Sequence, residues 1–230
     1  MKINLEKQTL KKPSSSIILN VVIKNHSTLL LAGLLCLPAW FAAAEQVPVS
    51  RPNIVLILID DMGYGDIQPF GSIKCQTPAL DRMASEGMKL TSFYAAPVCS
   101  ASRAQIMTGC YAPRVSILGA LRTDSSVGLN PAEHTIAELL KAQGYVTMLV
   151  GKWHLGDQSA FFPLNYGFDH YFGLPYSNDM LRPEAGDGHK YVVPLMQDNK
   201  VIELWDENKE DQLVKLYTEK AVEFIQSNRN

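Results

Sequence analysis

Three groups of polar side chains in this sequence have residue types and spacing that could do chemistry. Cys99 follows a strand-like tract and precedes a helix-like run, where a nucleophile can lie beside helix N–H groups. Asp60 and Asp61 directly follow an apolar run, and adjacent carboxylates there suit a hard divalent cation. Lys152 and His154 stand two apart in a later loop and can present a cation and a titratable donor to an anion. Taken singly, such groups are more often structural: a buried cysteine in a turn, a solvated acidic turn, a surface loop.

The strands that must position these groups are predicted from apolar runs. The continuous β-branched run at 53–59 predicts a strand buried on both faces, and 145–150 predicts a second one. A further strand-like tract at 89–96 leads to Cys99. The acidic loop and the Lys-x-His loop then both follow the carboxyl ends of strands, which is where open α/β sheets bind ligands. We therefore expect an α/β fold with a mostly parallel sheet flanked by helices.

Helices are predicted at three places, with an irregular stretch among them. Residues 77–87 begin with Thr-Pro and end at glycine, and 135–144 open with the capping box Thr-Ile-Ala-Glu. Residues 210–227 carry apolar side chains at helical spacing. The stretch 174–200 is rich in Pro, Gly and Asp and is expected to be a surface excursion. An α/β unit that stops on a crossover helix lacks its next strand, so we expect the domain to be incomplete at the C-terminus.

Composition and charge argue against two classes of binding partner. The chain has 230 residues, 47% of them hydrophobic and 19% charged, with a formal net charge of −2. This near-neutral balance gives no electrostatic reason to expect nucleic acid or an acidic membrane surface as a partner.

The first 44 residues have the pattern of a secretory signal peptide. Scattered lysines precede an apolar run at 29–42, which ends in the small residues Ala42-Ala43-Ala44. We expect cleavage after Ala44, a mature catalytic domain at 45–230, export to the periplasm or beyond the cell, and no membrane span after cleavage.

Export would leave an odd number of cysteines in an oxidising compartment. The mature chain would retain Cys75, Cys99 and Cys110, so one thiol is unpaired or modified. If Cys99 is the one set apart, Cys75 and Cys110 could pair. No C-x-x-C motif supports a zinc or redox site.

Taken in order, the motifs resemble those of the sulfatase family, within the alkaline-phosphatase-like superfamily. Residues 51–66 resemble its N-terminal strand and calcium loop. The stretch 99–103, Cys-Ser-Ala-Ser-Arg, followed by Met-Thr-Gly at 107–109, resembles its nucleophile signature. Residues 144–156 resemble its second signature, and 167–179 resemble the stretch that follows in arylsulfatase A-like members.

The resemblance implies hydrolysis of sulfate esters by covalent catalysis. A maturation enzyme would convert Cys99 to formylglycine, whose hydrated aldehyde attacks sulfur with one hydroxyl and expels sulfate with the help of the other. Asp60 and Asp61 would hold Ca²⁺, which also binds the formylglycine. Arg103 would fix the diol, and Lys152 would bind a sulfate oxygen. The resemblance also implies that His154 contacts the diol as a base and that Ser177 forms a hydrogen bond with it.

The sequence departs from the family pattern in two respects. Ala101 stands where the signature commonly has proline, which leaves open which maturation enzyme reads it. The family also places a histidine, an Asp-Asn pair and a second lysine after the helix on which this chain ends, and nothing at 180–230 substitutes for them. The resemblance therefore implies an N-terminal half.

Three functions stay open at this point. The first is a sulfuric ester hydrolase acting on a sulfated small molecule or glycan. The second is a phosphate or phosphonate ester hydrolase of the same superfamily. The third is a non-catalytic, truncated remnant.

Overall fold

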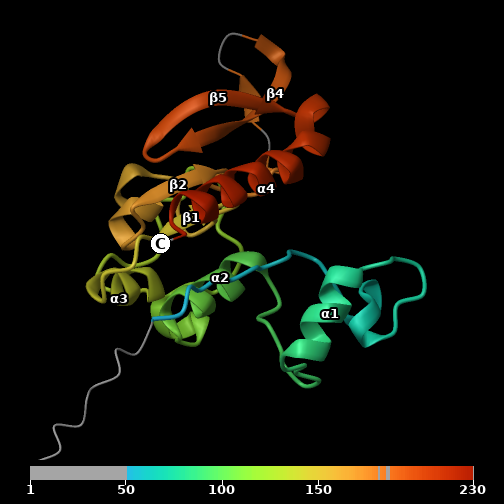
Figure 1. Ribbon diagram of the computed structural model, residues 1–230. Helices are drawn as coiled ribbons and strands as arrows, with labels where there is room; N and C mark the ends of the chain where they lie inside the picture. Colours follow the sequence, from blue (N-terminus) through green and yellow to red (C-terminus); the bar gives the residue numbers. More distant parts are fainter. Residues whose placement is uncertain (1–50, 181, 185–186, 230) are drawn as a thin grey trace, which may run out of the picture. The chain divides into compact units, whose positions relative to one another are not determined.

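A computed structural model describes residues 51–180, 182–184 and 187–229 (Figure 1). The chain divides into two units, residues 1–56 and 57–230, and every helix and strand named below lies in the second. The predicted signal peptide at 1–44 lies outside the described residues. No helix among those described is both long and apolar enough to cross a bilayer.

Along the second unit three α-helices come first, five strands follow, and a fourth α-helix comes after the strands. The α-helices are α1 (Pro78–Glu86), α2 (Cys99–Thr108), α3 (Ile136–Ala142) and α4 (Glu210–Ser227). The strands are β1 (Met148–Val150), β2 (His170–Gly173), β3 (Arg182–Glu184), β4 (Asp187–Gln197) and β5 (Lys200–Asp206). Short 3-10 helices lie at Tyr64–Asp66, Gln68–Phe70, Ala112–Val115, Ser159–Phe161, Pro163–Tyr166 and Glu207–Lys209.

The strands form one mixed sheet. Its order is β1-β2-β4-β3, and β5 pairs with β4. Among the described strands only β1 and β2 pair in parallel, whereas the other three pairings are antiparallel. The α/β class is confirmed, but among the described strands the sheet is mixed and not mostly parallel. The reason is local: β4 and β5 are joined at Asp198, whose φ of +54° allows the tight reversal that forces antiparallel pairing.

The prediction of a surface excursion at 174–200 was wrong, because β4 is a core strand. Its Val193 and Leu195 are 1% and 2% exposed, and Met196 is also buried. Proline and glycine at the start of this stretch obscured the apolar run Val-Val-Pro-Leu-Met that follows them. A proline inside this run lowers the strand expectation without preventing strand formation.

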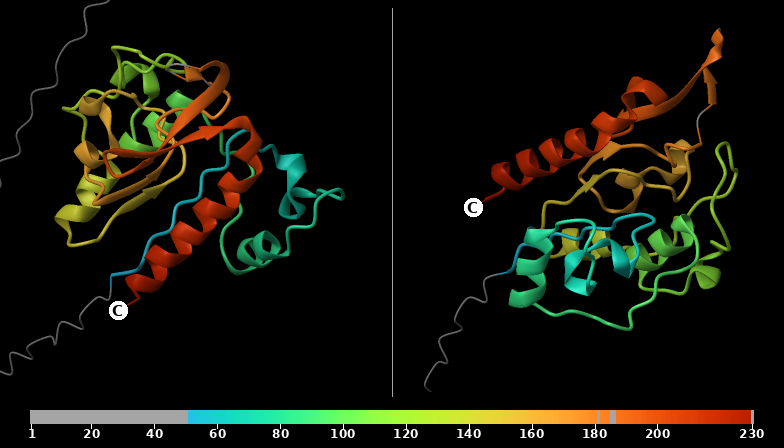
Figure 2. Two further views of the ribbon diagram at one scale, coloured as in Figure 1. Left: turned by 90° about the horizontal axis from the view of Figure 1, so that it is seen from above. Right: turned by 90° about the vertical axis from the view of Figure 1, so that its right-hand side faces the viewer.

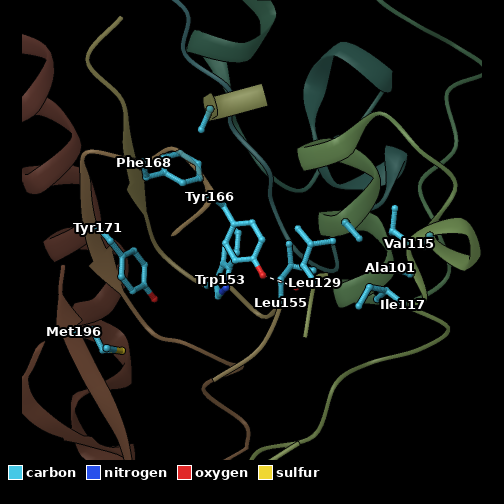
Figure 3. Close-up of a cluster of buried hydrophobic side chains, with 13 residues drawn as sticks. Ala101, Val115, Ile117, Leu129, Trp153, Leu155, Tyr166, Phe168, Tyr171 and Met196 are labelled. Atoms are coloured by element: carbon cyan, nitrogen blue, oxygen red, sulfur yellow. Dashed lines mark hydrogen bonds between the residues drawn. The ribbon is translucent and has the colours of Figure 1, made fainter. Parts of the chain in front are cut away.

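The strands β1 and β2 have apolar side chains on both faces, and these belong to two separate apolar clusters. Leu149 and Tyr171 face a cluster with α2 and α3, whereas Val150 and Phe172 face a cluster with β5 and α4. This alternation is the two-residue period of a strand. Figure 2 shows α4 on one side of the sheet and α2 on the other. Figure 3 shows the first cluster, in which the Tyr166 hydroxyl donates to the Leu129 carbonyl.

The predicted helices are confirmed, and their caps are visible. Pro78 begins α1 and Gly87 ends it. At α3 the hydroxyl of Thr135 accepts from the Glu138 N–H at 3.2 Å, and the Glu138 carboxylate accepts from the Thr135 N–H at 2.8 Å. The helix α4 covers the predicted 210–227.

Two predicted strands are absent from the described part of the chain. Neither 53–59 nor 89–96 has strand structure, and Ile57 and Ile59 are 70% and 48% exposed. A strand is stabilised by hydrogen bonds to a neighbouring strand. No strand among the described residues pairs with 53–59, so its apolar side chains lack the sheet that would bury them.

Candidate active site

The helix α2 places Cys99 and Arg103 on one face. It begins at Cys99 itself, whereas the sequence predicted a helix only after this residue, and Val98 is the N-cap residue. Ala101 and Ala104 are 4% and 0% exposed and fix the opposite side of the helix to the core. Residues four apart share a helix face, so Cys99 and Arg103 both line one cavity of about 230 Å³.

The loop after β1 is held beside the chain that follows β2. The N–H groups of Gly151, Trp153 and His154 donate to the carbonyls of residues 172, 174 and 175 at 2.8, 2.9 and 3.0 Å. A Cβ at Gly173 would lie 1.9 Å from the Gly151 carbonyl oxygen, so only glycine allows the two segments to approach so closely. Lys152 and His154 are thereby fixed at the carboxyl end of β1.

Lys152, Arg103 and Asp60 form a charged cluster. The Asp60 Oδ2 lies 2.8 Å from the Lys152 ammonium and 3.4 Å from the Arg103 Nη2. Arg103 also donates to the Lys152 carbonyl, and the Lys152 ammonium donates to the Ser177 hydroxyl at 3.0 Å. Burial acts to raise the pKa of Asp60, but the hydrogen bond from Lys152 and the charges of Lys152 and Arg103 outweigh it and lower that pKa. Asp60 is therefore a carboxylate at neutral pH.

His154 lies between Cys99 and a backbone carbonyl. Its Nδ1 is 3.1 Å from the Cys99 sulfur, and its Nε2 is 2.8 Å from the Leu121 carbonyl oxygen. A carbonyl can only accept, so Nε2 carries the proton, and in the neutral ring Nδ1 is the acceptor that faces Cys99. His154 is 1% exposed. Burial, together with the charges of Lys152 and Arg103, lowers its pKa and keeps the ring neutral at pH 7.

His154 also has an unusual backbone. Its φ is +58°, in the left-handed region that residues other than glycine rarely adopt. Such conformations cost free energy and are retained where the surroundings enforce them, often at functional sites. Here the hydrogen bond from the His154 N–H to the Pro175 carbonyl is one such constraint.

The structure brings together all seven residues that the sequence singled out. Direct contacts join Asp60, Arg103, Lys152 and Ser177 into one set and, separately, Cys99 with His154. Asp61 lines the same cavity as Cys99 and has a φ of +57°. Their individual catalytic roles stay predictions.

Sequence reasoning missed two partners of this cluster. The Leu121 carbonyl holds His154, and the buried Ser100 hydroxyl accepts from the Leu121 N–H. A backbone carbonyl leaves no signal in a sequence, because every residue carries one. A serine beside a nucleophile could have been noted, but nothing in the sequence indicates that it contacts residue 121.

The carboxylates fit a calcium ion in kind but not in number. Asp60 and Asp61 bring oxygen ligands to the cavity that Cys99 lines, and Ca²⁺ takes six to eight oxygens. The described residues contain no group of three or more His, Cys, Asp or Glu side chains placed to hold a metal. Two carboxylates alone therefore fall short of a complete calcium site. Cys75 and Cys110 are both free thiols, so the pair suggested for them is not formed.

Comparison with known proteins gives consistent matches. The mouse (Mus musculus) arylsulfatase G is 37% identical over 211 residues, covering 81% of this chain. The mouse N-acetylgalactosamine-6-sulfatase is 40% identical over 210 residues, covering 84%. The chain spans about 40% of the length of both relatives.

Solved structures share the fold. The crystal structure of Ps i-CgsB superposes with a TM-score of 0.66 at 32% identity, covering 76% of this chain and 41% of that one. The structure of BT4656 in complex with its substrate D-glucosamine-2-N,6-O-disulfate gives a TM-score of 0.57 at 29% identity, covering 78% and 32%. The sequence model of the family described as Sulfatase matches residues 52–230. The chain therefore belongs to the sulfatase family.

Proposed function

We propose that this protein hydrolyses sulfate esters and that Cys99 provides the nucleophile. The observation that carries the proposal is the contact between Cys99 and the unprotonated Nδ1 of His154, beside the two cations Arg103 and Lys152. Attack on an anionic ester requires a proton acceptor in contact with the reacting group. It also requires fixed cations nearby.

Each side chain has a role that its position supports. His154 accepts a proton from the reacting group at residue 99, because its Nδ1 carries no proton and its ring is neutral. Lys152 and Arg103 bind sulfate oxygens and the group at residue 99, since their cationic heads converge on Asp60 at the edge of the cavity. Ser177 fixes the Lys152 ammonium by accepting a hydrogen bond from it.

Two groups complete the proposed site. Formylglycine, made from Cys99 by a maturation enzyme, supplies a hydroxyl nucleophile and a route for releasing sulfate. Calcium, when bound, supplies positive charge beside the sulfate group, and Asp60 and Asp61 would hold it with further oxygens. Cys99 begins α2, is only partly buried and lines the cavity.

We propose a sulfated sugar as the substrate class and export as the destination. The support for the substrate comes from BT4656, whose substrate is a sulfated glucosamine, and from the relative named as an N-acetylgalactosamine-6-sulfatase. The support for export comes from the pattern of residues 1–44.

The direct test is mass spectrometry of the peptide that carries Cys99, followed by an assay of aryl sulfate hydrolysis. The protein would be expressed in a host with a formylglycine-generating enzyme. We expect the thiol to be converted to an aldehyde, and we expect Cys99→Ala to abolish turnover. The matched control is Cys110→Ala, since Cys110 is another partly buried free thiol and lies outside the cavity lining. An unmodified Cys99 in active protein would overturn the proposed nucleophile.

A further inference from the structure

The residue after Cys99 is a buried serine with a single clear partner. Ser100 is 0% exposed, and its hydroxyl oxygen accepts a hydrogen bond from the Leu121 N–H at 3.0 Å. Its neighbours on the buried side of α2 are Ala101 and Ala104, so a small side chain without a hydroxyl would also fit this helix. Burying a hydroxyl costs free energy unless it is hydrogen-bonded. The bond to Leu121 is what offsets that cost here.

The partner of Ser100 is the same residue that holds His154. The Leu121 N–H is bound by Ser100, and the Leu121 carbonyl accepts from the His154 Nε2–H at 2.8 Å. Leu121 lies in a stretch, 116–135, without helix or strand. Its neighbourhood includes Leu118, which is 82% exposed. Secondary structure therefore does not fix the backbone at Leu121, and the hydrogen bond from α2 ties it to the core.

These contacts form a closed ring of four residues that includes the proposed nucleophile. Cys99 and Ser100 are consecutive on α2, Ser100 binds Leu121, Leu121 binds His154, and His154 contacts Cys99 at 3.1 Å. The proton on Nε2 requires an acceptor at the Leu121 carbonyl position. If that carbonyl moved away, the proton could equally reside on Nδ1, and the nitrogen facing Cys99 would then be a donor.

We propose that Ser100 is a positioning residue for the active site. Through the Leu121 backbone it holds the carbonyl that fixes the His154 tautomer, and so keeps Nδ1 as the acceptor toward residue 99. The kinetic consequence rests on the proposed sulfatase function, whereas the tautomer itself does not.

The test measures the His154 tautomer directly, in the full chain and at one fixed pH. Histidine is labelled with ¹⁵N, and the His154 signals are identified by their loss in His154→Gln. The ¹⁵N shifts of Nδ1 and Nε2 report which nitrogen carries the proton. We expect the wild type to show the proton on Nε2 and Ser100→Ala to show a mixture of the two tautomers.

A matched variant separates this role from a general effect on α2. Ser102 lies on the same helix, and its hydroxyl donates to the Ala96 carbonyl at 3.0 Å, away from Leu121. Ser102→Ala should therefore keep the wild-type tautomer, and Ser100→Thr, which retains the acceptor oxygen, should restore it. A folded Ser100→Ala with the wild-type tautomer would overturn the proposal.

A second measurement applies to the wild type alone, in case Ser100→Ala does not fold. Amide hydrogen exchange at Leu121 should be slow for a residue without secondary structure, because its N–H is bound to a buried hydroxyl. Exchange as fast as at the exposed Leu118 would also refute the proposal.

Kinetic measurements show whether a failure lies in the role of Ser100 or in the proposed sulfatase function. In the formylglycine-bearing enzyme, Ser100→Ala should lower kcat about tenfold with little change in KM, because proton acceptance is impaired while the sulfate-binding cations are intact. If the tautomer changes but no variant hydrolyses sulfate esters, the positioning role stands and the proposed function fails. If hydrolysis is observed and the tautomer is unchanged, the positioning role fails alone.

Discussion

Replacing Gly173 with alanine should displace the loop that carries Lys152 and His154. The new Cβ would lie 1.9 Å from the Gly151 carbonyl oxygen, where ordinary contacts begin at 3.4 Å. The two segments would thus have to separate by about 1.5 Å, and neither can yield by turning a side chain, since both atoms are tied to the backbone. The neighbouring hydrogen bond from the Gly151 N–H to the Phe172 carbonyl would be strained at the same time.

The expected cost follows from that displacement. Overpacking of this kind typically costs 1–3 kcal/mol, and a weakened backbone hydrogen bond adds roughly 1 kcal/mol. A loss of about 3 kcal/mol corresponds to a fall in Tm of roughly 6–12 °C for a chain of this size. A shift of about 1 Å at the reacting groups can lower the rate about 100-fold.

The assay combines thermal unfolding with aryl sulfate hydrolysis on the same preparations. The control is Gly65→Ala, because a Cβ there meets nothing within 4 Å and the backbone needs no positive φ. Gly65→Ala should melt within about 2 °C of the wild type. If Gly173→Ala melts no lower than Gly65→Ala, the close approach of the two segments does not position the site, and the reasoning is refuted.

Three further changes test other contacts. Lys152→Met removes the cation that contacts Asp60 and should lower kcat/KM for an aryl sulfate about 10²–10³-fold. Thr135→Val removes the cap of α3 and the hydroxyl donor to the buried Tyr166 carbonyl, and should cost about 2–3 kcal/mol of unfolding free energy, measured by urea denaturation. The hydrogen bond from Lys141 lowers the pKa of Asp169 from its ordinary value of 3.8, so its stabilisation is complete above pH 3.8 and is lost as the pH falls further. Asp169→Asn should therefore flatten the fall in stability between about pH 4 and pH 2.

Each of these outcomes has a contrary result. Unchanged sulfate hydrolysis in Lys152→Met would show that the Lys152 ammonium does not contribute to catalysis. The matched control is Lys215→Met, at an exposed position of α4. A Thr135→Val loss no larger than that of an exposed threonine such as Thr218→Val would show that the α3 cap and the Tyr166 contact contribute little. Identical acid unfolding curves for wild type and Asp169→Asn would mean that this carboxylate has the same pKa in both folded and unfolded chains.

The sequence predicted helices better than strands, for a physical reason. A helix closes its hydrogen bonds within a few residues, so Thr135 and Glu138 could indicate the start of α3 without knowledge of the rest of the fold. A strand depends on a neighbour that the sequence does not identify. The apolar run at 53–59 illustrates this dependence, since it has strand composition but no strand structure.

The site was predictable as a set of residues but not as a network. Cys99, Asp60 and His154 stand in motifs, and the motifs predicted that they would lie together. The contacts that connect them run through groups without a sequence signal, chiefly the Leu121 carbonyl and the Lys152 carbonyl. The pairing of Lys152 with Asp60 spans 92 positions in the sequence, and only the folded loop after β1 brings the two side chains within 2.8 Å.

The charges of the site explain why anion capture would need more than its own cations. Arg103 and Lys152 supply two positive charges, and both contact the carboxylate of Asp60. Asp61 adds a second carboxylate to the cavity, so the four side chains balance one another. A sulfate ester is anionic and gains little from a neutral site. The carboxylates that offset Arg103 and Lys152 are also the oxygen ligands that a divalent cation prefers, and its binding there would leave the pocket with net positive charge. With such a cation bound, the acidic loop would assist anion binding, although the charge of the loop alone opposes it.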